Sequence, residues 1–303
     1  MRRGGFVRVP ARPAAPALLA FSSFLGLVVG APFAHAGGGW VPERGHSYVE
    51  TSILYLSTDA RYDQDGDRTP FTRLTGVARA TTYSDAGIYA FGEFGLGKGF
   101  GIEGDISWRR LHSTEPATRF ATWGPGDLRV LVKRGFRAGS LAWAVSLEGK
   151  VPLGYDETEY PSLGSGHADF AGFVHAGYGT SAFYAQAEIG ARGRGGPPRD
   201  EWPFAAQAGW NFAPRWQLIG DVRGNGLFGS EPIAAPPAGV SGTTTAETVF
   251  DPQTASSSIV MAGPGLAFAP STGARISVQA WRSLAGTNTP EGWKWKLAFA
   301  RVR

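Results

Sequence analysis

The stretch YDQDGDR, Tyr62 to Arg68, carries three aspartates at alternate positions around a glycine. An EF-hand loop binds calcium through oxygen ligands at positions 1, 3, 5 and 12, with glycine at position 6. If Gly66 takes position 6, Asp63 and Asp65 fill positions 3 and 5, but an arginine and a threonine fall at positions 1 and 12. Asp-Gly is also a common pair in tight turns. We therefore predict a solvated loop tip between residues 59 and 67 and no metal site.

Serine and histidine could hydrolyse esters if both lay on one face of a strand, two residues apart. The His-Ser pairs at 46–47 and 112–113 are adjacent in sequence, so they point to opposite faces. His167, Asp169 and His175 share a face, yet no serine stands at a matching spacing. There is no Walker A loop, no HExxH motif and no cysteine. The sequence predicts no enzyme, no catalytic residue and no cofactor.

The first 36 residues differ from the others. Four arginines precede an apolar stretch at 14–29, which ends in the small-x-small motif Ala34-His35-Ala36. This pattern predicts a secretory signal peptide at 1–36 and a mature chain at 37–303. The leader holds four of the 29 basic residues and no acid, which leaves 25 of each sign. The mature chain is thus neutral, and we expect no nucleic-acid partner.

About twelve segments of roughly ten or more residues alternate apolar and polar side chains, the length that a tilted strand needs to cross a bilayer. The clearest is FGIEGDISWRR, Phe100 to Arg110, in which one face is apolar and the other carries charges. Short connections near 98–99, 137–139, 180–181, 213–214 and 270–272 alternate with longer ones at 59–80, 113–125, 154–165, 195–200, 229–254 and 285–290. This pattern is typical of bacterial outer-membrane barrels, with both termini on the short-turn, periplasmic side.

A soluble β-sandwich also alternates, but its strands are shorter. Aromatic residues gather here near strand ends, at Phe94, Phe100, Phe212, Trp216 and Phe268, as in an interfacial girdle. We therefore predict an all-β, up-and-down antiparallel barrel of about 12 strands in the cell outer membrane. Its expected partners are outer-membrane lipids, the barrel-assembly machinery and small solutes.

The charged side chains on the polar face of these strands would point into the lumen. The lumen-lining candidates are Glu93, Glu103, Asp105, Arg109, Asp127, Arg129, Lys133, Glu148, Lys150, Glu188, Asp221, Arg223, Arg275, Lys294 and Lys296. Charges in a lumen require either water or close pairing, because burying them singly costs several kcal/mol. The pattern leaves two interpretations open: a plugged lumen of structural ion pairs, or a narrow hydrated pore that sorts solutes.

Several stretches resemble one family of outer-membrane barrels, named after a putative MetA pathway of phenol degradation. They are GGWVPERGHSYVETSILYLSTDARYDQDGDRTPF, GPGDLRVLVKRGF, LEGKVPLGYD, GHADFAGFVHAGYG and FYAQAEIGARGRGGPPRDEWPFAAQAGW. The resemblance implies a channel or transporter-like barrel, and the family name suggests aromatic compounds. It implies no catalytic residue. Such barrels usually end on an aromatic residue that the assembly machinery reads, whereas this chain continues past Phe299 to Arg303.

The leading hypothesis is an outer-membrane channel for small solutes, aromatic or apolar ones among them. The alternatives are a non-transporting structural or surface-interaction barrel, or a lipid-modifying outer-membrane enzyme without a known motif. About ten residues separate Gly37 from the first strand, which we judge too few for an N-terminal plug. The long loop at 229–254 could fold into the mouth or present a surface.

Overall fold

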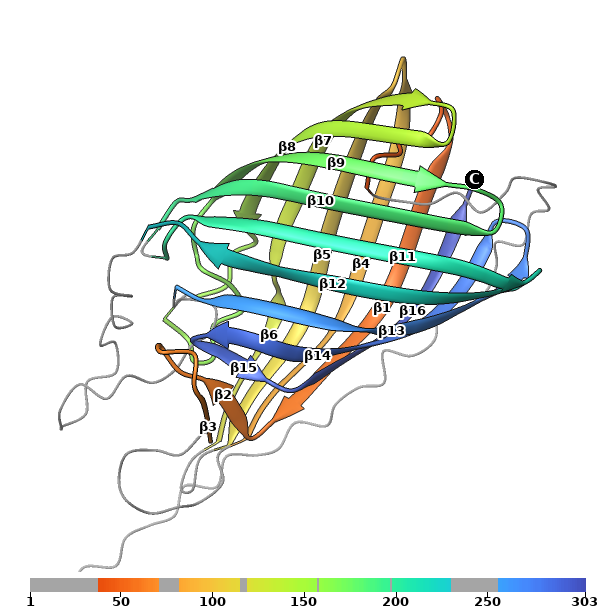
Figure 1. Ribbon diagram of the computed structural model, residues 1–303. Helices are drawn as coiled ribbons and strands as arrows, with labels where there is room; N and C mark the ends of the chain where they lie inside the picture. The colour runs from red at the N-terminus through yellow and green to blue at the C-terminus, as the bar shows by residue number, and fades with distance from the viewer. Residues whose placement is uncertain (1–37, 71–81, 115–118, 157, 197, 230–255) are drawn as a thin grey trace, which may run out of the picture.

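The computed structural model describes residues 38–70, 82–114, 119–156, 158–196, 198–229 and 256–303 (Figure 1). Within them, antiparallel strands form one closed barrel with twelve positions around its circumference, and we call each position a stave. The wall strands are β1 (Ser47–Thr58), β4 (Thr82–Gly97), β5 (Phe100–Thr114), β6 (Arg119–Pro125), β7 (Asp127–Ala138), β8 (Leu141–Pro152), β9 (Asp169–Gly179), β10 (Phe183–Arg194), β11 (Glu201–Ala213), β12 (Trp216–Leu227), β13 (Ser258–Ser271), β14 (Ala274–Thr287) and β16 (Trp293–Val302).

The ring closes because β1 pairs with both β4 and β16. Strands β6 and β7 act as one stave, since both pair with β5 and only Gly126 separates them. A closed sheet leaves no strand edge unpaired, which is the condition for crossing lipid with strands. The predicted all-β barrel of about 12 strands is confirmed.

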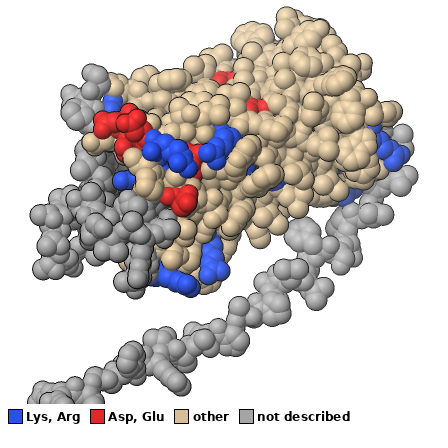
Figure 2. Space-filling model, turned by 60° about the horizontal axis from the view of Figure 1, so that its bottom comes forward, with Lys and Arg blue, Asp and Glu red and all other residues tan. Residues whose placement is uncertain are grey.

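The alternation of side chains sets the two surfaces of this wall. On β5, Ile106 and Trp108 are exposed on the outside, while Ser107 and Leu111 are buried inside. The outer face is largely uncharged, and charged side chains gather toward its ends in the space-filling view (Figure 2). The girdle residues Phe94, Phe100, Phe212 and Trp216 are exposed at the short-turn end. The assigned inside-outside parity is therefore confirmed for these strands.

Short turns join the strands at the end where the chain terminus lies (Figure 1). There, the Ser47 N–H donates to the carbonyl of Arg303 at 2.9 Å. At the opposite end, β2 (Ala60–Tyr62), β3 (Arg68–Pro70) and β15 (Thr289–Glu291) form a small separate sheet. No helix in the described residues is long and apolar enough to span a membrane.

The predicted connection at 59–80 separates β1 from β4 and holds β2 and β3, which lie outside the barrel wall. Two other predicted connections overlap wall strands: 113–125 contains the end of β5 and all of β6, and 285–290 begins inside β14. A strand of seven residues such as β6 gives too few alternations to be recognised in the sequence. Much of the long loop at 229–254 lies outside the described residues.

The YDQDGDR stretch turns the chain from β2 to β3. The Asp63 carboxylate accepts hydrogen bonds from the backbone N–H groups of Asp65 and Asp67, at 3.0 and 2.9 Å. Gly66 has a φ of 85°, which glycine adopts without strain. In the described residues, no group of three or more His, Asp or Glu side chains is arranged to hold a metal ion. Asp63 thus caps its own turn.

Candidate functional site

A cavity of about 860 Å³ occupies the barrel interior. Its walls come from nearly all staves, and side chains of both signs line it. Eleven of the fifteen predicted lumen residues line this cavity: Glu103, Asp105, Arg109, Arg129, Glu148, Glu188, Asp221, Arg223, Arg275, Lys294 and Lys296. The structure thus brings together, in one space, side chains that are up to 193 positions apart in sequence.

The other four predicted residues point inward but are not among the cavity-lining residues. They are Glu93, Asp127, Lys133 and Lys150. Lys133 is only 1% exposed and lies between Glu93, at 3.5 Å, and Glu103. The two carboxylates compensate the charge of this buried lysine within the barrel wall. These residues therefore join neighbouring strands of the wall.

A chain of alternating charges crosses the inner face from β7 to β11. It runs Asp127, Lys150, Asp169, Arg194, Glu201, Arg192, Glu148. The successive N–O distances are 2.9, 2.9, 3.1, 3.5, 2.6 and 2.8 Å. Every charge in it has an opposite neighbour, although the Nε atoms of Arg192 and Arg194 make no hydrogen bond to the described residues. We call these seven residues the paired wall.

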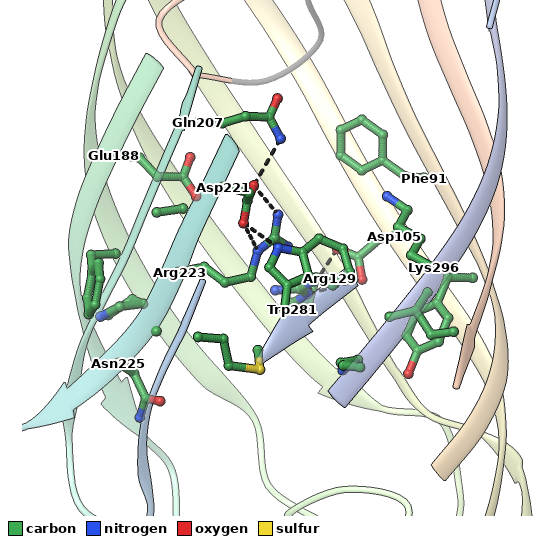
Figure 3. A pocket seen from close by; sticks show the side chains of 18 of the residues that line it. Phe91, Asp105, Arg129, Glu188, Gln207, Asp221, Arg223, Asn225, Trp281 and Lys296 are labelled. Carbon is green, nitrogen blue, oxygen red and sulfur yellow. Dashed lines mark hydrogen bonds and ion pairs between the residues drawn. The ribbon is translucent and has the colours of Figure 1, made fainter. Parts of the chain in front are cut away.

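Three further pairs project into the cavity itself. Arg109 makes a two-point contact with Asp85 at 2.8 and 3.3 Å, and Arg129 contacts Asp105 at 2.9 Å. Arg223 lies on Asp221 at 2.7 Å and over the ring of Trp281 at 4.6 Å. Figure 3 shows the Asp221–Arg223 pair, with Gln207 donating to the same aspartate. These arginines present charge to the cavity while keeping a partner.

The opposite wall, on β14 and β16, is basic. Lys296 pairs with Glu50 on β1, and Arg275 donates to the side-chain amide oxygen of Gln217 at 2.8 Å. Lys294 lines the cavity but has no carboxylate within ion-pair distance and no hydrogen bond among the described residues. We call the inward residues Gln279, Trp281, Lys294 and Lys296 the open wall.

His175 sits in a hydrogen-bonded row across three staves. Its Nδ1 lies 3.1 Å from Glu188 on β10, and its Nε2 lies 2.7 Å from the Ser146 hydroxyl on β8. Because a carboxylate only accepts, Nδ1 donates and Nε2 accepts from Ser146. Sequence reasoning found no serine for this histidine because the partner comes from another strand. Ser146 is 5% exposed, and its hydrogen bond together with that of Glu188 fixes the orientation of the His175 ring.

The connection from β8 to β9 folds back into the long-loop mouth. Leu163 packs on Tyr83 and Leu111, and its carbonyl accepts a hydrogen bond from Arg109 at 2.9 Å. Tyr155 donates its phenol proton to Asp127. Burial and that hydrogen bond raise the pKa of Tyr155, which keeps the phenol protonated. This inward loop had no sequence signal beyond its length.

At the short-turn end, residues 38–42 lie inside the barrel, which corrects the expectation that this segment is too short for a plug. A Cβ on Gly177 would meet the Trp40 ring at 2.6 Å, and a Cβ on Gly135 would meet Val41 at 2.6 Å. A Cβ on Gly39 would likewise meet the carbonyl oxygen of Ala142 at 2.6 Å. A few residues suffice because inward glycines leave a groove for them, so the cavity is narrowed at both ends.

The sequence was compared with known proteins. No family model and no curated protein matches it, so the resemblance to the phenol-degradation family stays a prediction. Among solved structures, the COG4313 outer membrane channel from Pseudomonas putida F1 is 13% identical, with a TM-score of 0.64 over 89% of this chain and 100% of that one. The chain therefore has the fold of an outer-membrane channel.

The KdgM porin is 6% identical, with a TM-score of 0.48 over 84% of this chain and 98% of that one. The CymD monoaromatic hydrocarbon channel is 7% identical, with a TM-score of 0.41 over 86% and 89%.

Proposed function

We propose that the protein is an outer-membrane channel that lets small solutes, aromatic or apolar ones among them, pass through the barrel lumen. The observation that carries this proposal is the cavity of about 860 Å³ inside a closed barrel, lined by charged, aromatic and aliphatic side chains together. A lumen that served only to hold the wall together would use all of its charges in pairs, as the paired wall does.

The lining also supports the choice of solute. Tyr89, Phe91 and Trp281 face the same space as Leu54 and Leu56. The same space is also lined by many charged side chains of both signs. A small solute that combines a ring with a polar group matches both kinds of side chain, and the cavity volume lies within the range of about 300–1,000 Å³ that is usual for small-molecule sites.

Liposome swelling tests the proposal. Refolded chain 37–303 in vesicles should let small solutes in, with a rate that falls steeply as solute size rises. Trp40→Ala should raise the rate, because the indole lies against Gly177 and Gly179 in the short-turn mouth. The matched control is Trp202→Ala, an exposed indole on the outer face, which should leave the rate unchanged. Vesicles that swell no faster than empty ones would refute the channel.

A further inference from the structure

Lys294 lines the cavity from β16, and no partner within the described barrel wall accounts for its charge. It projects inward from β16, with Leu56 of β1 on one side and Trp281 of β14 on the other. In the part of the chain that the structure describes, no carboxylate lies within ion-pair distance of its ammonium group and no hydrogen bond holds it. An ammonium that faces the cavity without a counter-charge from the protein is compensated by water in the lumen or by an anionic solute.

The charges around Lys294 do not supply that compensation. Its electrostatic neighbours are Asp85 and the three arginines Arg109, Arg223 and Arg129. Asp85 is already engaged by Arg109 through two hydrogen bonds, and the other two arginines are engaged by Asp221 and Asp105. Lys294 is thus a surplus positive charge in a region where each remaining cation already has its partner.

Gln279 adds a second, independent observation. It is 6% exposed, lines the cavity and has an Nε2 group that finds no acceptor within the described residues. It stands directly opposite Lys296 in the β14–β16 register, and Trp281 stands opposite Lys294. Diagonal neighbours in a sheet lie within reach of long side chains. Two donors that lack acceptors, Lys294 and Gln279, therefore stand diagonally across the β14–β16 pair, and we refer to them as one patch.

The flanks of this patch are apolar. Leu54 and Leu56 on β1 pair with Lys296 and Lys294, and both line the cavity. On the other side stands Trp281, which is 2% exposed: its Nε1 donates to Asp221 at 2.7 Å and Arg223 lies over its ring at 4.6 Å, so the indole closes this flank. Donors beside two leucines favour a ligand that has an acceptor group and an apolar body.

We propose that Lys294 and Gln279 form a carboxylate-binding subsite in the lumen, and that the solute it takes is a small aromatic monocarboxylate. The carboxylate accepts from the Lys294 ammonium and the Gln279 amide, and the ring lies against Leu54 and Leu56. This inference rests on the proposed function in one respect: the solute must be able to enter the lumen.

Isothermal titration calorimetry on the refolded full-length mature barrel tests the subsite with benzoate as the probe. Benzyl alcohol has the same ring without the charge, and acetate has the charge without the ring. Benzoate should bind, and both comparison compounds should bind at least about tenfold more weakly, since each loses one half of the site. Equal binding of benzoate and benzyl alcohol would overturn the carboxylate assignment, and equal binding of benzoate and acetate would overturn the ring assignment.

Substitutions locate the site. Lys294→Met and Gln279→Glu should each weaken benzoate binding about tenfold, the second by placing a carboxylate on Lys294 and against the ligand. Lys294→Arg keeps the charge and should retain most of the affinity. The control Lys98→Asn removes a lysine from a periplasmic turn, where φ is 53° and asparagine is tolerated. Unchanged affinity in Lys294→Met, with its heat-modifiable migration showing a folded barrel, would overturn the proposal.

The subsite and the channel can fail separately, because calorimetry needs no flow of ions. A benzoate isotherm that responds to Lys294→Met in a barrel that passes no solute would support the subsite and refute the proposed function. A barrel that passes solutes but shows no benzoate isotherm would overturn the subsite and leave the channel standing.

Discussion

The two charged walls of the lumen are built from the same strand pattern but use their charges differently. In the paired wall, seven charges on β7 to β11 alternate in sign and contact one another. In the open wall, Lys294 and Gln279 keep donors that find no acceptor in the described residues. The charges of the paired wall hold neighbouring strands together, whereas in the open wall Lys296 pairs with Glu50 and only Lys294 and Gln279 keep free donors within the described residues.

The difference follows from neighbouring side chains on adjacent strands. Directly opposite positions in a sheet are close enough to form ion pairs, and unlike charges there stabilise the pair. Lys150 stands opposite Asp169 and Arg192 stands opposite Glu201, whereas Lys294 stands between a leucine and a tryptophan. The strand register therefore decides which charges become structural.

The largest effect should come from breaking the paired wall. Asp169 receives both Lys150, at 2.9 Å, and Arg194, at 3.1 Å. Asp169→Ala leaves two buried cations short of a partner, so we expect a loss of roughly 3–5 kcal/mol in the free energy of unfolding. Urea unfolding of the barrel in lipid vesicles measures it.

The control for that experiment is Asp156→Ala. Asp156 is exposed on a loop and bonds only Thr158 next to it, so we expect a change within about 0.5 kcal/mol. If both aspartate variants unfolded at the same urea concentration as the unsubstituted barrel, the paired wall would not contribute to the stability of the fold.

A smaller effect should come from a substitution on the outer face. Inward and outward residues alternate along each strand, so this substitution also tests which residues of the two walls point inward. Ile106 is exposed on β5 among other apolar side chains. Ile106→Arg should cost roughly 2–4 kcal/mol of barrel stability if the position lies near the middle of the bilayer. The same urea titration measures it, with Ile106→Leu as the size-matched control. An arginine as well tolerated as leucine would contradict the assignment of lipid and lumen faces.

Ion selectivity should respond more modestly, and with opposite signs. Arg129 is 44% exposed to the lumen, so Arg129→Gln should shift the reversal potential in a salt gradient toward cation preference. Glu103→Gln should shift it toward anions, but less, because Lys133 already holds Glu103. Planar-bilayer recordings under a tenfold salt gradient give both values. Identical reversal potentials in the two variants would argue against a wet lumen at these residues.

The smallest effect on stability should come from the open wall. Lys294→Met removes a charge without a carboxylate partner, so the free energy of unfolding should stay the same or rise by less than about 1 kcal/mol. This outcome is the reverse of that for Asp169→Ala, although both substitutions remove an inward charge. A loss comparable to that of Asp169→Ala would mean that Lys294 is structural too.

The sequence allowed the wall to be predicted because strand alternation has a period of two and repeats in every stave. It placed Glu103 and Arg129 inside and Ile106 outside, as the structure has them. Pairing across strands is a different matter. Ser146, His175 and Glu188 come from three strands, and only the register brings them into hydrogen-bond distance.

The two inward segments could not be predicted for a similar reason. Trp40 and Val41 fit inside because Gly177 and Gly135, which are distant in sequence, have no side chains at the positions where these two residues lie. The β8–β9 loop turns inward because Leu163 packs on Tyr83 of β4 and Leu111 of β5. Alternation assigns a face to each residue but says nothing of which inward residues meet.

Single-channel conductance of the refolded chain 37–303 in a planar bilayer tests the central claim most directly, that the lumen is a passage and not a sealed core. We expect discrete conductance steps, and we expect benzoate to reduce them in the unsubstituted barrel but not in Lys294→Met. A bilayer that stays silent, while heat-modifiable migration shows the barrel to be folded, would contradict the account and make the lumen a closed structural core.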